Sequence, residues 1–280
     1  MDRKKNQVKQ PLVSIIIPAY NEERYIEFSL KSLLSQTYKN IEIIVVDDGS
    51  NDQTEQIVGK YPVKLVKQNH KGLGAARNAG VKNSNGELLA FLDADIKYDK
   101  KYIERLAEPV LNGKAIGTFN KEEYVANADN IWSKCWSINS DLPIGKRAPD
   151  ILPDELPVYR LIKRSAFEKV GGFGSKEGYF DDATIATKLG VNAVSAPGAI
   201  AYHFNPETLS EVFYSSRWIG RGQQGEKSFM NLLRYSFLNS LRNAIRKIIK
   251  GAPVQYLIFK IVYDFGMFCG IFLSFGKLQK

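Results

Sequence analysis

Short apolar runs alternate with helical patterns through the first half of the chain. Four runs rich in β-branched or other apolar residues predict buried strands: Val13–Pro18, Ile41–Val46, Val63–Val66 and Leu88–Leu92. Four intervening or following stretches predict helices: Glu22–Gln36, Asn51–Gly59, Leu73–Lys82 and Lys100–Leu111. This alternation indicates an α/β fold, in which helices flank both faces of a mostly parallel sheet. Ligands of such sheets bind beyond the carboxyl ends of the strands, so the residues that follow each strand are the candidates for chemistry.

The pattern becomes less regular after the fourth predicted helix. Phe119–Pro157 contains several Pro and Gly breaks and is expected to be a loop region rather than a separate domain. A strand is predicted to open at Val158, a short helix to cover Ala183–Leu189 and a further strand to cover Asn192–Pro197. Another helix is expected to begin near Pro206.

Two apolar segments end the chain. Phe229–Lys250 predicts an amphipathic helix whose basic face has no acid, which is typical of a helix on lipid headgroups; a helix docked on a soluble domain is the alternative. Val254–Phe275 is interrupted only by Lys260 and Asp264, whose spacing places them on one helical face, where they neutralise each other. Its length permits a membrane span, but two charges at mid-depth make crossing costly, so an embedded or hairpin-like anchor is expected. The small residues at the ends of Gly266–Gly270 are expected to let helices approach closely.

The charge of the chain is unevenly placed. The net charge is +9, and residues 217–280 hold eleven Lys or Arg against two acids, whereas residues 1–216 hold 28 of each sign. A neutral body with a basic, apolar tail indicates contact with an anionic membrane surface, and no zinc-finger or RNA-recognition signature points to nucleic acid.

The two cysteines, Cys135 and Cys269, lie far apart in the sequence, which argues against a disulfide framework and a zinc site. The basic first ten residues precede no apolar run, so a secretory signal peptide is not expected.

Three polar clusters follow predicted strands. They are Pro18–Glu22, Asp47–Asp52 and Asp93–Asp95. Because the carboxyl ends of parallel strands meet at one edge of a sheet, the acids of these clusters are expected to crowd together, and crowded carboxylates repel one another unless a cation lies among them. Helix capping by Ser50 or Asp52 is the alternative explanation for a single member of the set.

Six motifs occur in order between Pro11 and Arg221. They are SIIIPAYNE, VVDDGSND, ARNAG, FLDAD, GGF and an acidic pair before a helix. Together they resemble the inverting family-2 glycosyltransferases of the GT-A fold, a Rossmann-like α/β fold. The resemblance implies a catalytic domain over residues 1–222 and a membrane-associating helical tail over residues 223–280. It also places acceptor recognition in the irregular region before Val158.

The resemblance implies a nucleotide-sugar donor, a UDP- or GDP-sugar, and a divalent cofactor, Mn²⁺ or Mg²⁺. A hard cation prefers oxygen ligands and stabilises the charge on a departing diphosphate. Asp95 is the expected metal ligand, with Asp93 assisting through the ribose or a metal-bound water. His203 is a candidate to complete the metal sphere or to touch the diphosphate; a structural histidine is the alternative.

Further residues are expected around the donor. By resemblance, Asp48 accepts a hydrogen bond from the nucleobase, and Tyr20 stacks on the base unless it is a buried core residue. Arg77 is expected to pair with the ribose or a phosphate, or to form a salt bridge with Asp48 or Asp93. The helix after Pro206 is expected to close over the diphosphate or to begin the membrane-facing surface. The remaining donor-site candidates, from the first polar cluster and from this helix, are Pro18, Glu22, Arg217, Trp218 and Arg221.

The acidic pair carries the expected catalytic base. Asp182 matches the catalytic base of the family. Asp181 stands where the family more commonly has glutamate, so either of the two acids could be the base. The alternative to a catalytic role is that Asp182 caps the following helix. The reaction expected is transfer of a sugar to a hydroxyl acceptor, a lipid-linked or cell-surface glycan, at the cytoplasmic face of the cell membrane. A polyprenyl-phosphate sugar synthase and a non-catalytic nucleotide-sugar-binding membrane scaffold are the alternatives.

Overall fold

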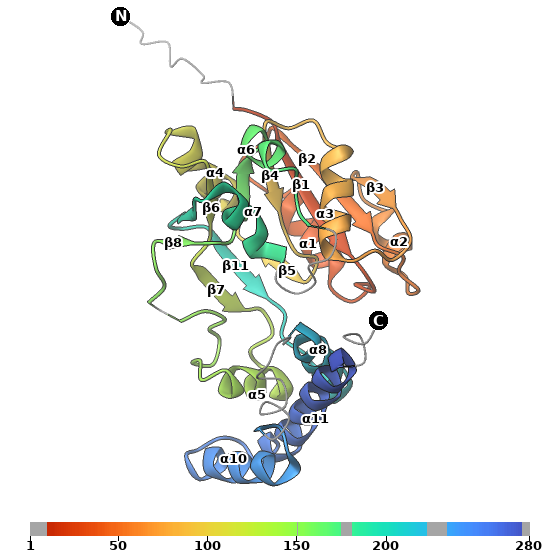
Figure 1. The fold of residues 1–280 in the computed structure, drawn as a ribbon, viewed down its shortest axis with the longest axis vertical. Coiled ribbons are helices and arrows are strands. Elements are labelled where there is room, and N and C mark those ends of the chain that lie inside the picture. The colour runs from red at the N-terminus through yellow and green to blue at the C-terminus, as the bar shows by residue number, and fades with distance from the viewer. Residues whose placement is uncertain (1–9, 150, 175–180, 223–233, 276–280) are drawn as a thin grey trace, which may run out of the picture. The chain divides into compact units, whose positions relative to one another are not determined.

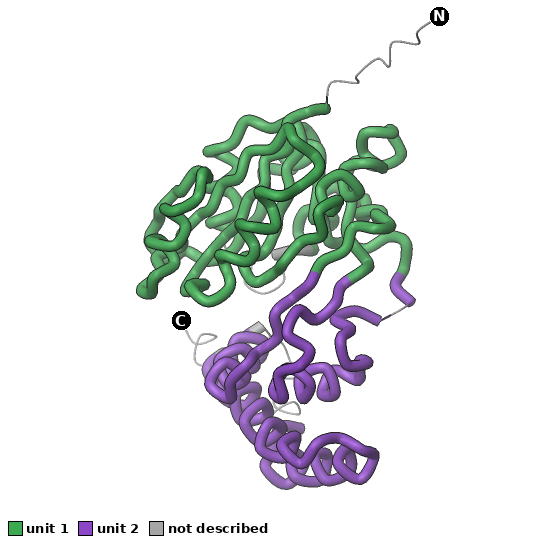
Figure 2. Tube along the Cα trace, turned by 180° about the vertical axis from the view of Figure 1, so that it is seen from behind, with its two compact units in different colours: residues 1–122, 153–177, 181–201 green, residues 123–152, 178–180, 202–280 purple. Residues whose placement is uncertain are grey.

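The computed structural model describes residues 10–149, 151–174, 181–222 and 234–275, without the side chains of 181, 182, 222, 274 and 275. The chain divides into two units, which Figure 2 colours separately. Unit 1 comprises Met1–Glu122, Pro153–Glu177 and Asp181–Ala201; unit 2 comprises Glu123–Leu152, Gly178–Phe180 and Tyr202–Lys280. This division differs from a boundary at residue 222, because residues 123–152 and 202–222 group with the C-terminal helices.

One sheet forms the centre of unit 1 (Figure 1). In the described residues its strand order is β3-β2-β1-β4-β9-β6-β10-β8; β3, β2, β1 and β4 run parallel, while β9 and β8 run antiparallel to their neighbours. The predicted α/β class with a mostly parallel sheet is confirmed. The strands are β1 (Val13–Ala19), β2 (Ile41–Asp47), β3 (Lys64–Lys67), β4 (Leu88–Phe91), β6 (Gly117–Phe119), β8 (Glu155–Leu156), β9 (Leu161–Lys163) and β10 (Ala193–Ser195).

Helices cover both faces of this sheet. They are α1 (Ile26–Leu34), α2 (Thr54–Val58), α3 (Leu73–Lys82), α4 (Tyr102–Leu111), α6 (Arg164–Lys169) and α7 (Asp181–Leu189). The side chains of Ile15 and Ile17 in β1 join the core cluster that contains α1 and α4, whereas Ile16 points to the opposite face. This alternation, with every one of these residues buried, is what the continuous apolar run predicted.

Several elements differ from the predicted boundaries. Helix α1 begins at Ile26 rather than Glu22, because Asn21 has a φ of 58° and the Glu22 N–H donates to Thr54 Oγ1 at 2.8 Å, so these residues form a turn. The predicted strand at Val158 begins only at Leu161. Strand β5 (Ile96–Tyr98) and helix α6 were not predicted from the sequence. Strands β7 (Glu122–Val125) and β11 (Ile200–His203), also not predicted, each begin in unit 1 and end in unit 2.

Unit 2 is mainly helical. Its helices within the described residues are α5 (Ile131–Asn139), α8 (Leu209–Gly222), α10 (Phe237–Ile249) and α11 (Tyr256–Phe275). The predicted pair on α11 is confirmed: Lys260 Nζ lies 2.8 Å from Asp264 Oδ1, and Ser240 Oγ of α10 donates to Asp264 Oδ2 at 2.7 Å. The residues of the predicted amphipathic helix from 229 to 233 lie outside the described part of the chain.

Helices α8 and α11 pack in parallel with almost no side chain between them. A Cβ at Gly266 would lie 2.6 Å from Phe213 O, a Cβ at Gly220 would lie 2.6 Å from Met267 O, and a Cβ at Gly270 would overlap Arg217 O. The predicted close approach at Gly266–Gly270 is thus confirmed, and its partner is a small residue pair on α8, Ser216 and Gly220. This packing is the physical reason that α8 belongs to unit 2.

Candidate active site

The loops that follow β1 and β2 are bound to each other. Asn21 N–H donates to Ser50 Oγ at 2.9 Å, and Asn51 N–H donates back to Asn21 Oδ1 at 2.8 Å. Thr54, at the start of α2, accepts the Glu22 N–H. These bonds fix the first two polar clusters side by side at the carboxyl edge of the sheet, as the strand pattern predicted.

Asp48 is a buried carboxylate surrounded by donors from its own chain. Oδ1 accepts from Gln68 Nε2 at 2.6 Å and from the Lys71 N–H at 2.9 Å. Oδ2 accepts from the Gly72 N–H at 2.8 Å and lies 3.0 Å from His70 Nδ1, and the residue is 3% exposed. Since a carboxylate has about four acceptor positions, these groups fill them. Asp48 therefore holds the loop that leads into α3; its contact with a nucleobase stays a prediction.

Tyr20 and His70 form an exposed aromatic pair beside Asp48. Their ring centroids lie 4.2 Å apart with planes tilted by 33°, and Tyr20 is 43% exposed, so it is not a core residue. Gly49 permits this arrangement: its φ is +81°, and a Cβ there would lie 3.0 Å from the His70 backbone N. Two ring faces are thus available at the edge where the sequence predicted one, and His70 was not among the predicted donor-site residues.

Asp93 is held by two arginines. Arg160 Nη1 lies 2.9 Å from its Oδ2, and Arg77 Nη2 lies 3.4 Å from its Oδ1. The Arg77 guanidinium is buried and also lies 5.3 Å from the ring centroid of Phe173. Tyr98 completes the surroundings, because its hydroxyl accepts the Asp93 N–H and donates to the Asp93 carbonyl. The predicted alternative for Arg77, a salt bridge to Asp93, is confirmed.

The acids of the three clusters lie near one another. Burial raises the pKa of Glu22 well above its usual range, and the negative charges of Asp95, Asp93 and Asp52 raise that pKa further. Strands β1 and β4 pair in parallel, so the loops that carry Glu22 and Asp93–Asp95 leave the sheet at the same edge.

The carboxylates at this edge suit a hard cation only if a bound diphosphate supplies further oxygen ligands. Within the described ranges, no three His, Cys, Asp or Glu side chains are arranged to hold a metal by themselves. Mg²⁺ or Mn²⁺ bound to a diphosphate needs only one or two protein carboxylates, because phosphate oxygens and water supply the rest. The partly buried Asp95, with Glu22 beside it, fits that requirement, whereas Asp93 already faces two guanidinium groups.

Asn78 ties the ARNAG motif to the GGF motif. Its amide Nδ2 donates to Phe173 O at 2.9 Å, and its Oδ1 accepts the Phe173 N–H at 3.1 Å. Gly172 has a φ of +76°, and a Cβ there would lie 2.6 Å from Asn78 Oδ1. Gly80 lets α3 approach the sheet, because a Cβ there would lie 3.3 Å from Val46 Cγ2. The two motifs therefore form one structural unit that positions Arg77.

The other candidates are placed as follows. Pro18 lies in β1, partly buried. The backbones of Asp181 and Asp182 begin α7, but their side chains lie outside the described part of the chain. His203 lies in unit 2 at the end of β11, with Nδ1 3.0 Å from Phe204 O.

The helix after Pro206 is confirmed as α8, and its candidates also lie in unit 2. Trp218 is 51% exposed and Arg221 is exposed, whereas Arg217 is partly buried, and its Nε has no hydrogen-bond partner among the described residues. The roles of these residues stay predictions.

Arg160 was missed from the sequence. Its backbone bonds to Phe91 N–H at 2.9 Å, next to the end of β4, and this pairing brings its side chain to Asp93. The only signal was a single cation within the apolar run VYRLI.

Comparison with known proteins matches residues 14–171 to the family described as Glycosyl transferase family 2. An uncharacterized glycosyltransferase of Rickettsia felis is 46% identical over 259 residues, which cover 88% of this chain and 41% of that protein. The chain spans 16% to 41% of the length of eight curated relatives that it matches.

Solved structures resemble the chain in fold. Residues 1–349 of S. aureus TarS in complex with UDP-GlcNAc give a TM-score of 0.54 at 18% identity, covering 95% of this chain and 91% of that one. The mannosyltransferase PcManGT from Pyrobaculum calidifontis, in complex with GDP-Man and Mn²⁺, gives a TM-score of 0.54 at 19% identity, covering 97% and 76%.

Proposed function

Because this chain belongs to the family-2 glycosyltransferases, we propose that it moves a sugar, with inversion, from a nucleotide-sugar donor to a hydroxyl acceptor. The observation that supports this most is the convergence of Glu22, Asp93 and Asp95 at the carboxyl edge of the sheet. Carboxylates of separate loops repel one another there, and a divalent ion held with the donor diphosphate relieves that repulsion.

The residues at the carboxyl edge of the sheet are proposed to have different roles. Asp95 would hold Mn²⁺ or Mg²⁺, which when bound would stabilise the negative charge of the departing diphosphate. Tyr20 and His70 offer ring faces for the nucleobase, next to the loop that Asp48 fixes. Asp93, held by Arg77 and Arg160, is the group proposed to reach the ribose or a metal-bound water.

The donor proposed is a UDP- or GDP-sugar. In support, the solved neighbours of similar fold include one in complex with UDP-GlcNAc and one in complex with GDP-Man. The acceptor proposed is a lipid-linked or cell-surface glycan. Asp182 is proposed to take the proton of the attacking hydroxyl; a polyprenyl-phosphate acceptor would need no such base.

The test measures donor binding and transfer separately. A thermal-shift screen of nucleotide sugars, with and without Mn²⁺, should show one donor raising the melting temperature only with the ion, since ligands stabilise the state that binds them. Asp95→Ala should abolish both the ion-dependent shift and the transfer. Asp182→Asn should abolish transfer while the donor-induced shift persists. The control, Asp154→Asn, removes an exposed acid paired with Lys121, and both readouts should stay at wild-type level.

Each result has a defined meaning. Full transfer by Asp95→Ala would contradict the metal site. Active Asp182→Asn would favour the polyprenyl-phosphate sugar synthase. Donor binding with no transfer or hydrolysis for any acceptor would favour the non-catalytic scaffold.

We also propose that unit 2 associates with an anionic membrane at its cytoplasmic face. The buried residues of helix α10 are the small Ser240 and Ala244, with Ile248 packed beside them, while Leu238 is 76% and Ile249 80% exposed. An apolar face open to solvent is unlike a docked soluble helix and fits a helix on lipid.

Helix α11 supports the same proposal. Over Tyr256–Leu273 it is long and apolar enough to cross a membrane by length and composition, and 39% of this window is buried. Its one charged pair faces α10, and its glycines face α8. The face left over carries Ile258 and Phe272, both exposed, which supports an anchor lying in the interface rather than a span.

A further inference from the structure

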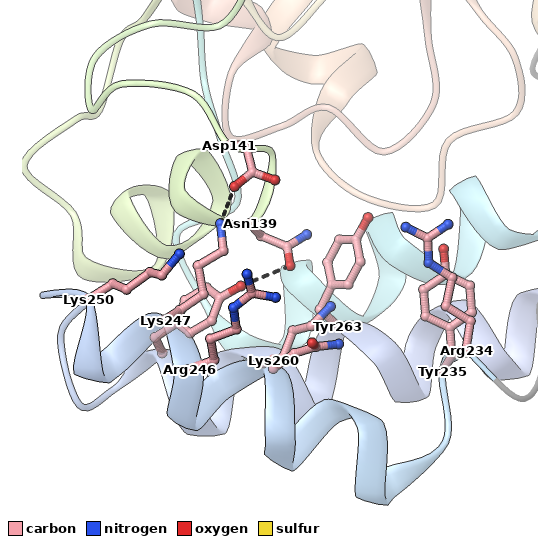
Figure 3. A pocket seen from close by; sticks show the side chains of 11 residues that line it. Asn139, Asp141, Arg234, Tyr235, Arg246, Lys247, Lys250, Lys260 and Tyr263 are labelled. Atoms are coloured by element: carbon pink, nitrogen blue, oxygen red, sulfur yellow. Dashed lines mark hydrogen bonds and ion pairs between the residues drawn. The ribbon is translucent and has the colours of Figure 1, made fainter.

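Unit 2 contains a polar cavity of about 510 Å³ among α5, α10 and α11 (Figure 3). Its volume lies within the roughly 300–1,000 Å³ of ordinary ligand sites. Five cations and one acid line it: Arg234, Arg246, Lys247, Lys250 and Lys260, with Asp141. Its walls also include side-chain amides and tyrosines, among them Asn139 and Tyr256.

Two of the five cations are already neutralised. Lys247 pairs with Asp141 of the segment after α5, and also donates to Ile138 O at 2.8 Å. Lys260 pairs with Asp264, which receives a second hydrogen bond from Ser240. Lys247 thus links α10 to α5 and the segment after it, while the Lys260–Asp264 pair within α11 is tied to α10 through Ser240.

The other three cations have no carboxylate partner in the described part of the chain. Arg246 of α10, Lys250 four residues later at the C-cap of this helix, and Arg234 form no ion pair with any residue that the structure describes. Like charges gathered at one cavity repel one another, and an anion in the cavity removes that cost. Arginine presents a fixed fork of donors that matches phosphate oxygens, and hydroxyl and amide groups add further hydrogen bonds.

We propose that this cavity is a binding site for a phosphate group, a monoester or a diphosphate, with Arg246 and Lys250 as its principal ligands. The site is separate from the carboxyl edge of the sheet in unit 1 and does not depend on the transfer reaction.

The phosphate proposed is the headgroup of a lipid. Ile245 directly precedes Arg246 and Ile249 directly precedes Lys250, and both isoleucines are exposed, so the apolar face of the helix borders the basic face. A ligand with a phosphate and an acyl chain satisfies both faces at once. A soluble phosphate satisfies only the basic one.

The experiment compares two kinds of vesicle with the full-length chain. One contains phosphatidylcholine and phosphatidate, a phosphate monoester; the other contains phosphatidylcholine and phosphatidylserine, a diester, in the proportion that gives equal surface potential. The wild type should bind phosphatidate vesicles roughly tenfold more tightly, a preference that charge attraction alone does not produce. Arg246→Gln should reduce this ratio to about one. The control Arg242→Gln removes an identical charge one turn away, outside the cavity, and should weaken binding to both vesicles equally.

The outcomes separate the sources of phosphate. A wild-type ratio near one, together with no binding of inorganic pyrophosphate by calorimetry, overturns the proposal. So does an equal change of the ratio in Arg246→Gln and Arg242→Gln. Pyrophosphate binding that requires Arg246, without a vesicle preference, assigns the cavity to a soluble phosphate and overturns the lipid source. Donor-induced thermal stabilisation should be unchanged in Arg246→Gln, so a failure here leaves the proposed transferase function untouched.

Discussion

Asp48→Asn tests whether this acid anchors its own loop. The carboxylate receives the Gln68 amide, the Lys71 and Gly72 N–H groups and the His70 ring, all within 3.0 Å. An amide offers a single acceptor oxygen and points an NH₂ group at donors, so at least two of these groups lose their partner. Hydrogen bonds to a charged group contribute about 1.5–3 kcal/mol each. The free energy of unfolding should therefore fall by about 3 kcal/mol or more.

The assay is thermal unfolding of the donor-free protein. For a domain of this size, about 1 kcal/mol corresponds to roughly 2–4 °C, so the melting temperature should fall by roughly 6–12 °C. Asp47→Asn is the matched control, because Asp47 is equally buried but accepts one hydrogen bond among the described residues, from the Ser50 N–H, which an amide oxygen retains. Its melting temperature should change by less than a third as much. If Asp48→Asn melts like the wild type and only loses donor affinity, then the residue acts as a nucleobase reader and not as an anchor.

Three further changes test other parts of the structure. Gly270→Val places a side chain against the α8 backbone and should cost about 1–3 kcal/mol in thermal unfolding, whereas Cys269→Val, one position away and partly exposed, should cost clearly less; equal losses would contradict the close packing. Asn78→Ala removes both hydrogen bonds to the GGF backbone and should lower stability by about 2 kcal/mol in urea unfolding; a wild-type midpoint would refute the link between the motifs. A double-mutant cycle of Arg160→Met and Asp93→Asn should give a coupling of about 0.5–3 kcal/mol in the same assay, and additive effects would show that the ion pair contributes nothing.

The first half of the fold followed from local pattern. Strands β1, β2 and β4 and helix α3 lie within a residue or so of their predicted bounds, because strands buried on both faces leave a continuous apolar run. The short elements β5 and β11 were missed because three or four residues carry too little periodicity. The start of α1 was predicted too early because hydrogen bonds to the neighbouring loop, at Thr54, override a helical pattern.

The sequence predicted the acidic residues of the candidate site, but not the residues that pair with them. Motif order located Asp48, Asp93 and Asp95 at strand ends, since a carboxylate after a strand is a local feature. The groups that complete the site, Arg160 and His70, come from distant positions and reach it only through strand pairing and a loop closure. The spacing of residues along the sequence does not predict such long-range contacts.

Asp93, the first acid of the FLDAD motif, is fixed by side chains from other parts of the chain. Asp93 is oriented by two guanidinium groups and by the Tyr98 hydroxyl, so its charge is compensated before any ligand arrives. Burial raises the pKa of Glu22, and the negative charges of Asp95, Asp93 and Asp52 raise that pKa further, so Glu22 is the acid that is costly to keep charged at this edge. Under the function proposed above, Asp95 would hold a divalent cation together with the donor diphosphate, and this would lower the cost of keeping Glu22 charged. Asp93, fixed by its partners, would then serve as an acceptor for a neutral hydrogen-bond donor such as a hydroxyl or a water, as the proposed function requires.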